Sequence, residues 1–326
     1  MKRLFLVIAA GFVVAAGCNK SAHEKTALAE ETGTSAVTQR NCASQDVLEQ
    51  QLQEDPALED RMNAIERFTQ QVIENPSAYR LLANGTVEIP VVVNVLYRTT
   101  AENISAAQIQ SQIDVLNEDF SATNADYNKT STYNSVKSGN IAIRFVLDQV
   151  IRKSTTKTSW TTNDAMKKTA QGGLNPTSPT TKLNLWVCNL SGGILGYAQF
   201  PGGSSATDGV VIDNNALGRT GTAAAPFNKG RTATHEVGHW LNLRHIWGDA
   251  SCGNDLVGDT PVHNTANYGC PAAGHKSTCS GQPVEMTMNY MDYTDDACMY
   301  MFTLGQESRM LAVFAVGGPR NSFAQP

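Results

Sequence analysis

The stretch HEVGHWLNLRH, residues 235–245, decides how this chain is interpreted. His235 and His239 are four residues apart, so on a helix both imidazoles lie on one face and reach a single metal ion. His245 comes after them, and the helix has to end before a third imidazole reaches that ion. The spacing predicts a three-histidine metal site on a helix expected over residues 229–243.

The glutamate inside this stretch indicates catalysis. Glu236 adjoins the first histidine and approaches a water bound to the metal. Zinc lowers the pKa of its bound water to about 7, and a carboxylate takes the proton as the water attacks a carbonyl. A structural zinc site needs no such carboxylate and usually has four protein ligands. The pattern therefore favours a zinc hydrolase with Glu236 as its base.

The stretch also resembles the metzincin zinc signature HExxHxxGxxH, with Asn242 in the place of the glycine. Asn tolerates the positive φ that this turn requires. The segment NYMDYTDDAC, residues 289–298, resembles the metzincin Met-turn, with Met291 as its methionine. Together with LGYAQFP at 195–201 and DGVVI at 208–212, these motifs are most similar to the pappalysins, the ulilysin-like group. The resemblance extends over about residues 87–319.

This resemblance implies a zinc-dependent endopeptidase acting on proteins or peptides. The implied fold is α+β, with a twisted mixed β-sheet above, a zinc-binding helix, and a loop-rich lower part clamped by disulfides. Tyr293 follows the Met-turn and is implied to stabilise the oxyanion. Met291 by itself would more often be a core residue, and Tyr293 a half-buried aromatic.

The first residues predict export. Lys2 and Arg3 precede a short apolar run, Leu4 to Ala16, as in a signal peptide. The segment VAAGC ending at Cys18 resembles a bacterial lipobox, although Ala15 replaces its usual leucine. We expect a lipoprotein-type signal over 1–18, with an ordinary secretory signal as the alternative. The protein would sit on the outer membrane or cell surface through a lipid anchor, or be secreted after processing.

Six cysteines remain after Cys18, and export places them in an oxidising compartment. Four lie in the last quarter of the chain, where three pairings are possible. The pappalysin resemblance implies the pairs Cys252–Cys279 and Cys270–Cys298. The other two are Cys42 and Cys188.

Residues 19–85 are expected to form a tether and a small helical pro-segment. Residues 19–40 are polar, and residues 45–75 have helical periodicity with many acidic side chains. By resemblance, Cys42 is a cysteine switch that ligates the zinc until the pro-segment is cut; a Cys42–Cys188 disulfide is the alternative. Arg80 marks a plausible site for that cut.

Residues 86–326 are expected to form the catalytic domain. Strands are predicted over 87–97, 141–151, 183–190 and 208–213, and a last helix near 304–314. Another helix is expected after Ser105, its cap, with four residues facing the core: Ile109, Ile113, Leu116 and Phe120.

A calcium site is expected in the loop after the zinc motif. Asp255 and Asp259 offer hard oxygens in a glycine-rich segment, and the resemblance adds Thr260. A solvated acidic loop is the alternative. His263 and His275 are interpreted as surface or loop residues that bind no metal.

Charge and composition bound the partners. With 41% apolar residues the chain can form a core, and its net charge of −5 argues against nucleic acid. An edge strand near 196–199 would bind extended peptides, and Asp295 and Asp296 would favour basic residues beside the cut. Two alternatives stay open: a non-enzymatic surface lipoprotein with a structural zinc site, and a zinc hydrolase of non-protein amides.

Overall fold

The computed structural model describes residues 37–76 and 85–324, and Val37–Pro326 is one compact unit. The signal peptide expected over 1–18, with Cys18, lies outside the described residues, as does the cut expected at Arg80. The main elements are α1 (Ser44–Glu54), α2 (Ala57–Glu74), β1 (Val87–Tyr97), α3 (Ala106–Phe120), β2 (Ile143–Ser154), β3 (Leu183–Cys188), β4 (Gly196–Ala198), β5 (Val210–Asp213), α4 (Arg231–Trp240) and α5 (Leu304–Ala312).

One mixed, five-stranded sheet organises the fold. Its order is β2-β1-β3-β5-β4, with β4 antiparallel to β5 and the other pairs parallel. The β-branched run of β1 is buried because this strand lies between two neighbours. β2 starts and ends later than expected. Its last residues, Arg152 to Ser154, pair with β1 although they show no apolar pattern that would have predicted a strand. β4 forms the edge of the sheet, as the sequence predicts.

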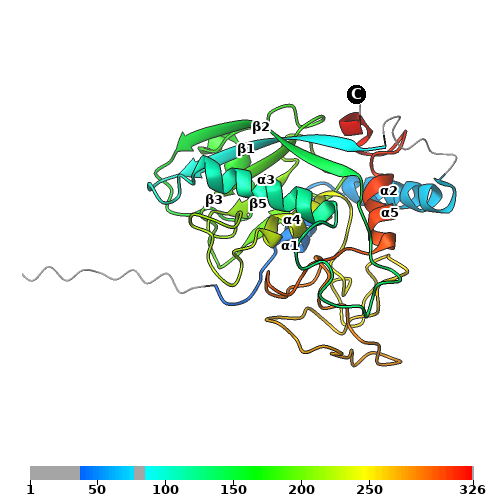
Figure 1. Ribbon diagram of the computed structural model, residues 1–326. Coiled ribbons are helices and arrows are strands. Elements are labelled where there is room, and N and C mark those ends of the chain that lie inside the picture. The colour runs from blue at the N-terminus through cyan, green and yellow to red at the C-terminus, as the bar shows by residue number, and fades with distance from the viewer. Residues whose placement is uncertain (1–36, 77–84, 325–326) are drawn as a thin grey trace, which may run out of the picture. The chain divides into compact units, whose positions relative to one another are not determined.

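Two helices pack against the sheet and carry the site. Ser105 caps α3 by accepting a hydrogen bond from Gln108 N, and the four predicted apolar residues of α3 are buried in the main core. α4 contacts α3, β4 and β5 (Figure 1). It is shorter than the expected 229–243, because Gly230 has a φ of 76° before it and the chain turns at Asn242, with a φ of 73°.

The helix expected over 45–75 is in fact two helices. α1 ends at Glu54 and α2 begins at Ala57. Pro56 disfavours helical backbone in the residue before it, and Asp55 has a φ of −135° and a ψ of 87°. The break lets α1 lie near β4 while α2 lies beside α5 (Figure 1).

The lower part of the molecule is irregular. Residues 241–303 form no helix or strand, and two disulfides join this segment, Cys252–Cys279 and Cys270–Cys298. This is the pairing that the pappalysin resemblance implies. In the part of the chain that the structure describes, no helix is both long and apolar enough to cross a membrane.

Candidate active site

Three imidazoles converge above the Met-turn. α4 carries His235 and His239 one turn apart, and the turn at Asn242 brings His245 back to them. The Nε2 atom of His239 lies 3.2 Å from that of His235 and 3.1 Å from that of His245. All three side chains are buried. The local sequence therefore brings its three histidines to one point.

The hydrogen bonds of these rings fix their tautomers. Each Nδ1 faces an oxygen acceptor, so it donates, and each Nε2 keeps a free lone pair. The acceptors are Tyr290 O at 2.7 Å, Leu243 O at 2.8 Å and the Asp249 carboxylate. Three lone pairs facing each other without a proton call for a cation. Around tetrahedral zinc, ligand nitrogens lie about 3.3 Å apart, close to the observed spacing.

Burial keeps the imidazoles of His235 and His239 neutral. Desolvation, with the nearby histidines, lowers the pKa of His239 to about 3 and that of His235 well below its ordinary value. Neutral imidazole is the form that binds a metal. The donor set thus fits zinc in both geometry and protonation.

Cys42 completes this cluster from the pro-segment. Its Sγ and the three imidazoles provide ligand atoms within 4.8 Å of one another. Neither Cys42 nor Cys188 forms a disulfide, and each is buried in a different core cluster. The alternative Cys42–Cys188 bond is therefore wrong for this structure.

Glu236 is buried beside the cluster. One of its oxygens, Oε2, accepts hydrogen bonds from Ser44 Oγ at 2.8 Å and from Cys42 Sγ at 3.3 Å. Burial raises the pKa of Glu236 to about 7, against the lowering effect of these hydrogen bonds and of Arg40. Two pro-segment side chains thus donate hydrogen bonds to the carboxylate that the sequence indicates as the catalytic base.

Tyr293 and Met291 lie around the metal ligands. The Tyr293 hydroxyl donates to the carbonyl oxygen of Cys42 at 2.9 Å, and its ring lies 4.9 Å from that of His245. Met291 is fully buried under α4. A Cβ added at Gly238 would come within 2.5 Å of the Met291 sulfur, so the helix approaches the Met-turn there only because residue 238 is glycine.

The segment around Cys42 lies along the edge strand and pairs with it. Leu195 N donates to Asn41 O at 2.9 Å, and Ala43 N donates to Gly196 O at 3.1 Å. These bonds are parallel β-bridging at the edge of β4. The edge strand predicted to bind extended peptide is therefore occupied by this chain's own residues.

Two residues before Cys42, a basic side chain fills a pocket. The Arg40 guanidinium, 2% exposed, donates to Thr294 O at 3.2 Å, Thr232 Oγ1 at 3.0 Å and Asp296 Oδ1 at 2.6 Å. It also lies 5.0 Å from the ring centre of Phe227. Asp296 is buried while Asp295 is only half-buried, so Asp296 is the carboxylate of this pocket.

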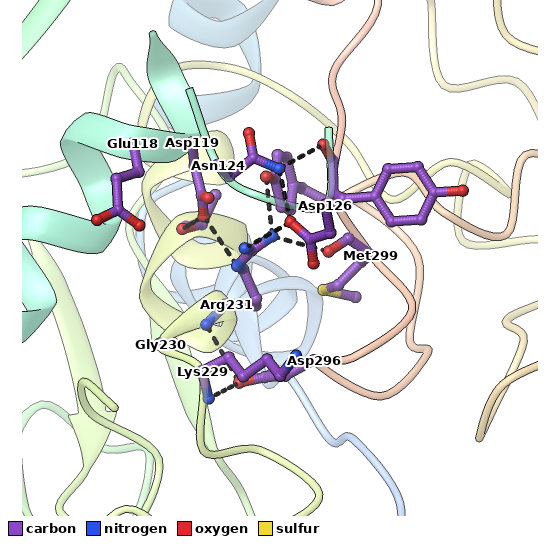
Figure 2. A network of polar contacts seen from close by, with 12 residues as sticks. Glu118, Asp119, Asn124, Asp126, Lys229, Gly230, Arg231, Asp296 and Met299 are labelled. Carbon is purple, nitrogen blue, oxygen red and sulfur yellow. Dashed lines mark hydrogen bonds and ion pairs between the residues drawn. The ribbon is translucent and has the colours of Figure 1, made fainter. Parts of the chain in front are cut away.

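A buried ionic network fixes the start of the zinc-binding helix (Figure 2). Arg231 pairs with Asp119 at 3.3 Å and Asp126 at 3.1 Å, and donates to the Tyr290 hydroxyl at 3.0 Å. Asp296 accepts from Lys229 N at 2.7 Å. The network therefore ties α4 to α3, to the Met-turn and to the Arg40 pocket.

The three expected calcium ligands form two separate sets of hydrogen bonds. Asp255 accepts from Thr260 Oγ1 at 2.9 Å, and these two side chains are neighbours. Asp259 instead accepts from Thr303 Oγ1 at 2.6 Å and Gly305 N at 2.8 Å, at the start of α5. Both oxygens of Asp259 thus accept hydrogen bonds at the start of α5, and calcium binding by Asp255, Asp259 and Thr260 stays a prediction.

His263 is also placed differently from expectation. It is fully buried, and its Nε2 accepts from Met286 N at 2.9 Å. Its Nδ1 faces Asp292 at 3.7 Å and Glu285 at 3.9 Å. His275 is exposed, as expected. His263 lies in an irregular segment, as one of the two expectations has it, but it is not at the surface, because an irregular segment gives no sequence periodicity from which burial could be predicted.

Three further residues of the site escaped sequence reasoning. Asp249 orients His245, Arg231 anchors the zinc-binding helix, and Ser44 binds Glu236. Asp249 lies four residues after His245, a spacing that suggests a local hydrogen bond. Nothing in the sequence signals the other two, because their partners are distant in the chain.

Comparisons with known proteins agree with this geometry. Residues 179–315 match a family model described as pregnancy-associated plasma protein-A. An extracellular metalloprotease of Verticillium alfalfae is 35% identical over 236 residues, which cover 68% of this chain and 77% of that protein. One of Pyricularia oryzae is 35% identical over 254 residues, covering 72% and 79%.

Solved structures extend the similarity. A mature mirolysin of Tannerella forsythia, in complex with a cleaved peptide, has a TM-score of 0.70 and 46% identity, covering 73% of this chain and 95% of that one. A promirolysin mutant of the same organism has a TM-score of 0.79 and 42% identity, covering 87% and 97%. With its three histidines, its Met-turn and these relatives, the chain belongs to the pappalysin family of zinc metalloendopeptidases.

Proposed function

We propose that this chain is the exported, latent precursor of an endopeptidase that cuts beside basic residues. The observation that carries the proposal is the course of residues 40–44. This segment pairs with the edge strand, presents Cys42 to the three histidines and fills a pocket with Arg40. A segment that occupies both the metal site and the peptide-binding edge prevents substrate from binding.

The residues that would hold zinc are His235, His239 and His245. Zinc, when bound, supplies a Lewis acid that acidifies water and polarises a carbonyl. Glu236 is the nearby base, and burial raises its pKa to about 7, which suits a group that takes and returns a proton at neutral pH. In the precursor its Oε2 is engaged by Ser44 and Cys42.

Tyr293 is proposed to stabilise the oxyanion. Its hydroxyl already donates to a peptide carbonyl oxygen, that of Cys42, in the segment occupying the cleft. A substrate carbonyl held at the same place would receive this hydrogen bond as negative charge develops on its oxygen. Burial raises the pKa of Tyr293 well above its ordinary value, so the hydroxyl keeps its proton.

A preference for basic residues is proposed from the Arg40 pocket. The pocket offers one carboxylate, one hydroxyl, one carbonyl and an aromatic ring to a guanidinium. Arg suits such a site better than Lys, because its planar fork meets several acceptors at once. The substrate's basic side chain would replace Arg40 on Asp296 after activation.

Several finer points stay proposals. The names of the curated relatives support secretion. Attachment through a lipid on Cys18 rests on the sequence pattern alone. Calcium binding is proposed at Asp255, Asp259 and Thr260, whose oxygens lie in the loop after the zinc motif. The division into a pro-segment up to residue 85 and a catalytic domain from residue 86 awaits sequencing of the processed form.

The proposed function is tested with three samples of the activated enzyme: the parent, the chelated parent and Glu236→Ala. We expect Glu236→Ala to keep its zinc, measured by elemental analysis, and to lose hydrolysis of a protein substrate. Proteolysis that survives this change would refute the mechanism. A peptide library then tests specificity: Asp296→Asn should reduce the enrichment of Arg and Lys beside the cut.

A further inference from the structure

The pro-segment binds the catalytic domain at a second place, away from the metal. Glu66 of α2 forms a bidentate ion pair with Arg309 of α5, with distances of 2.9 and 2.8 Å. The Arg309 side chain is 1% exposed and that of Glu66 is 28% exposed. An ion pair at this depth with both forks aligned binds more strongly than a surface pair.

The catalytic domain prepares Arg309 for this carboxylate. Its guanidinium also donates to Leu256 O at 3.2 Å and to Asn242 O at 3.4 Å. These carbonyls belong to the loop after the zinc motif and to the turn inside it. They hold the guanidinium in place, so a carboxylate meets a cation that the catalytic domain already orients.

Apolar and small residues shape the groove around this cation. Val72 packs against Ala312, the last residue of α5, and against Ala315 just beyond the helix. At the other end of α2, Leu58 packs against Phe200, whose ring lies 5.2 Å from that of His239. Thr69 is fully buried and receives a hydrogen bond from the Asn242 side chain at 3.4 Å. α2 therefore packs against the catalytic domain along most of its length, with Glu66 as the carboxylate that meets Arg309. We call the surface that α2 covers the groove.

Glycines leave room for this helix. A Cβ at Gly202 would lie 3.1 Å from Ile65, and one at Gly317 would lie 3.4 Å from Phe68. The carbonyl of Gly202 also accepts from Arg61 Nε at 2.8 Å. The catalytic domain therefore approaches α2 closely at Gly202 and at Gly317.

We propose that this groove is an independent binding site for helix α2 and that it retains the pro-segment after the chain is cut between Pro76 and Val87. The cut fragment would bind the catalytic domain at two places at once. Arg40 and Cys42 would bind in the cleft, and Glu66 would bind Arg309 of α5. Two linked contacts bind more tightly than either alone, so cleavage would not by itself end latency. This consequence rests on the proposed function, whereas the binding itself does not.

The test isolates the second site in the full precursor. Glu236→Ala prevents self-processing, and Arg40→Met with Cys42→Ala removes the two side-chain anchors in the cleft while the backbone bonds to β4 remain equal in every variant compared. A recognition sequence for a foreign protease is inserted after Pro76, the chain is cut, and the catalytic part is immobilised by its C-terminus. Release of the fragment is then followed over time.

We expect the fragment to remain bound in this background, and Glu66→Gln to speed its release about tenfold or more, since a charge-assisted pair is lost. Glu59→Gln is the matched control, because it makes the same change at an exposed position of the same helix. Thermal melting before the cut shows whether either change unfolds α2.

Two outcomes would overturn the proposal. One is complete release of the fragment in the first wash, and the other is equal release from Glu66→Gln and Glu59→Gln. Latency through Cys42 is judged separately, from the activity of an otherwise unchanged Cys42→Ala precursor. The retention site and the proposed function therefore fail on different measurements.

Discussion

Replacing Arg40 by Met in the precursor should weaken latency strongly. Met keeps an apolar stem against Phe227 but removes three hydrogen bonds, one of which is the ion pair with Asp296. Both partners of that pair are at most 1% exposed in their side chains. Breaking a buried pair costs about 3–5 kcal/mol, although Asp296 keeps its bonds to backbone N–H groups of residues 229 and 231.

We therefore take about 3 kcal/mol, the low end, which corresponds to roughly a 100-fold rise in the population with an open cleft. The assay follows hydrolysis of a small fluorogenic peptide by the uncut precursor, with gel analysis to show that the chain is still intact. Arg67→Met is the control, because it removes the same charge from an exposed position of α2.

The result that would refute this reasoning is an Arg40→Met precursor as inactive as the parent. In that case Cys42 and α2 would hold the segment without the pocket. A rise in activity equal to that of Arg67→Met would also refute it, because the effect would then come from net charge and not from Asp296.

Other predictions follow from single contacts. Asp249→Asn should lower zinc affinity about 10- to 100-fold in a chelator competition, because the carboxylate orienting His245 is lost; unchanged affinity would contradict this. Gly238→Ala should lower the stability by about 1–3 kcal/mol in thermal melting, because its Cβ meets Met291, and an unchanged Tm would contradict it. Burial raises the pKa of Glu66, but the hydrogen bonds and charge of Arg309 outweigh this effect. The pKa of docked Glu66 therefore lies below its ordinary value of 4.5. Docking of α2 should therefore be strongest above pH 4.5 and weaken as the pH falls through the docked-state pKa. A release rate of the cut fragment that does not change as the pH is lowered would contradict this.

Local patterns were readable from the sequence alone. The i, i+4 spacing of His235 and His239 predicts their common face because helical geometry relates neighbours four residues apart. The strand at 87–97, the cap at Ser105 and the positive φ of Asn242 follow from equally local preferences. Pro56 also signals the break between α1 and α2, although the periodicity on both sides obscured it.

The tertiary structure decided which distant groups meet. Arg40 reaches a carboxylate 256 residues away, and Glu66 reaches a guanidinium 243 residues away. The same holds for Asp259, whose oxygens serve the start of α5, and for His263, which is buried in an irregular segment. Zinc chemistry was readable because its ligands follow one helix and one turn. The latent state was only partly readable, because it depends on long-range contacts that no local pattern encodes.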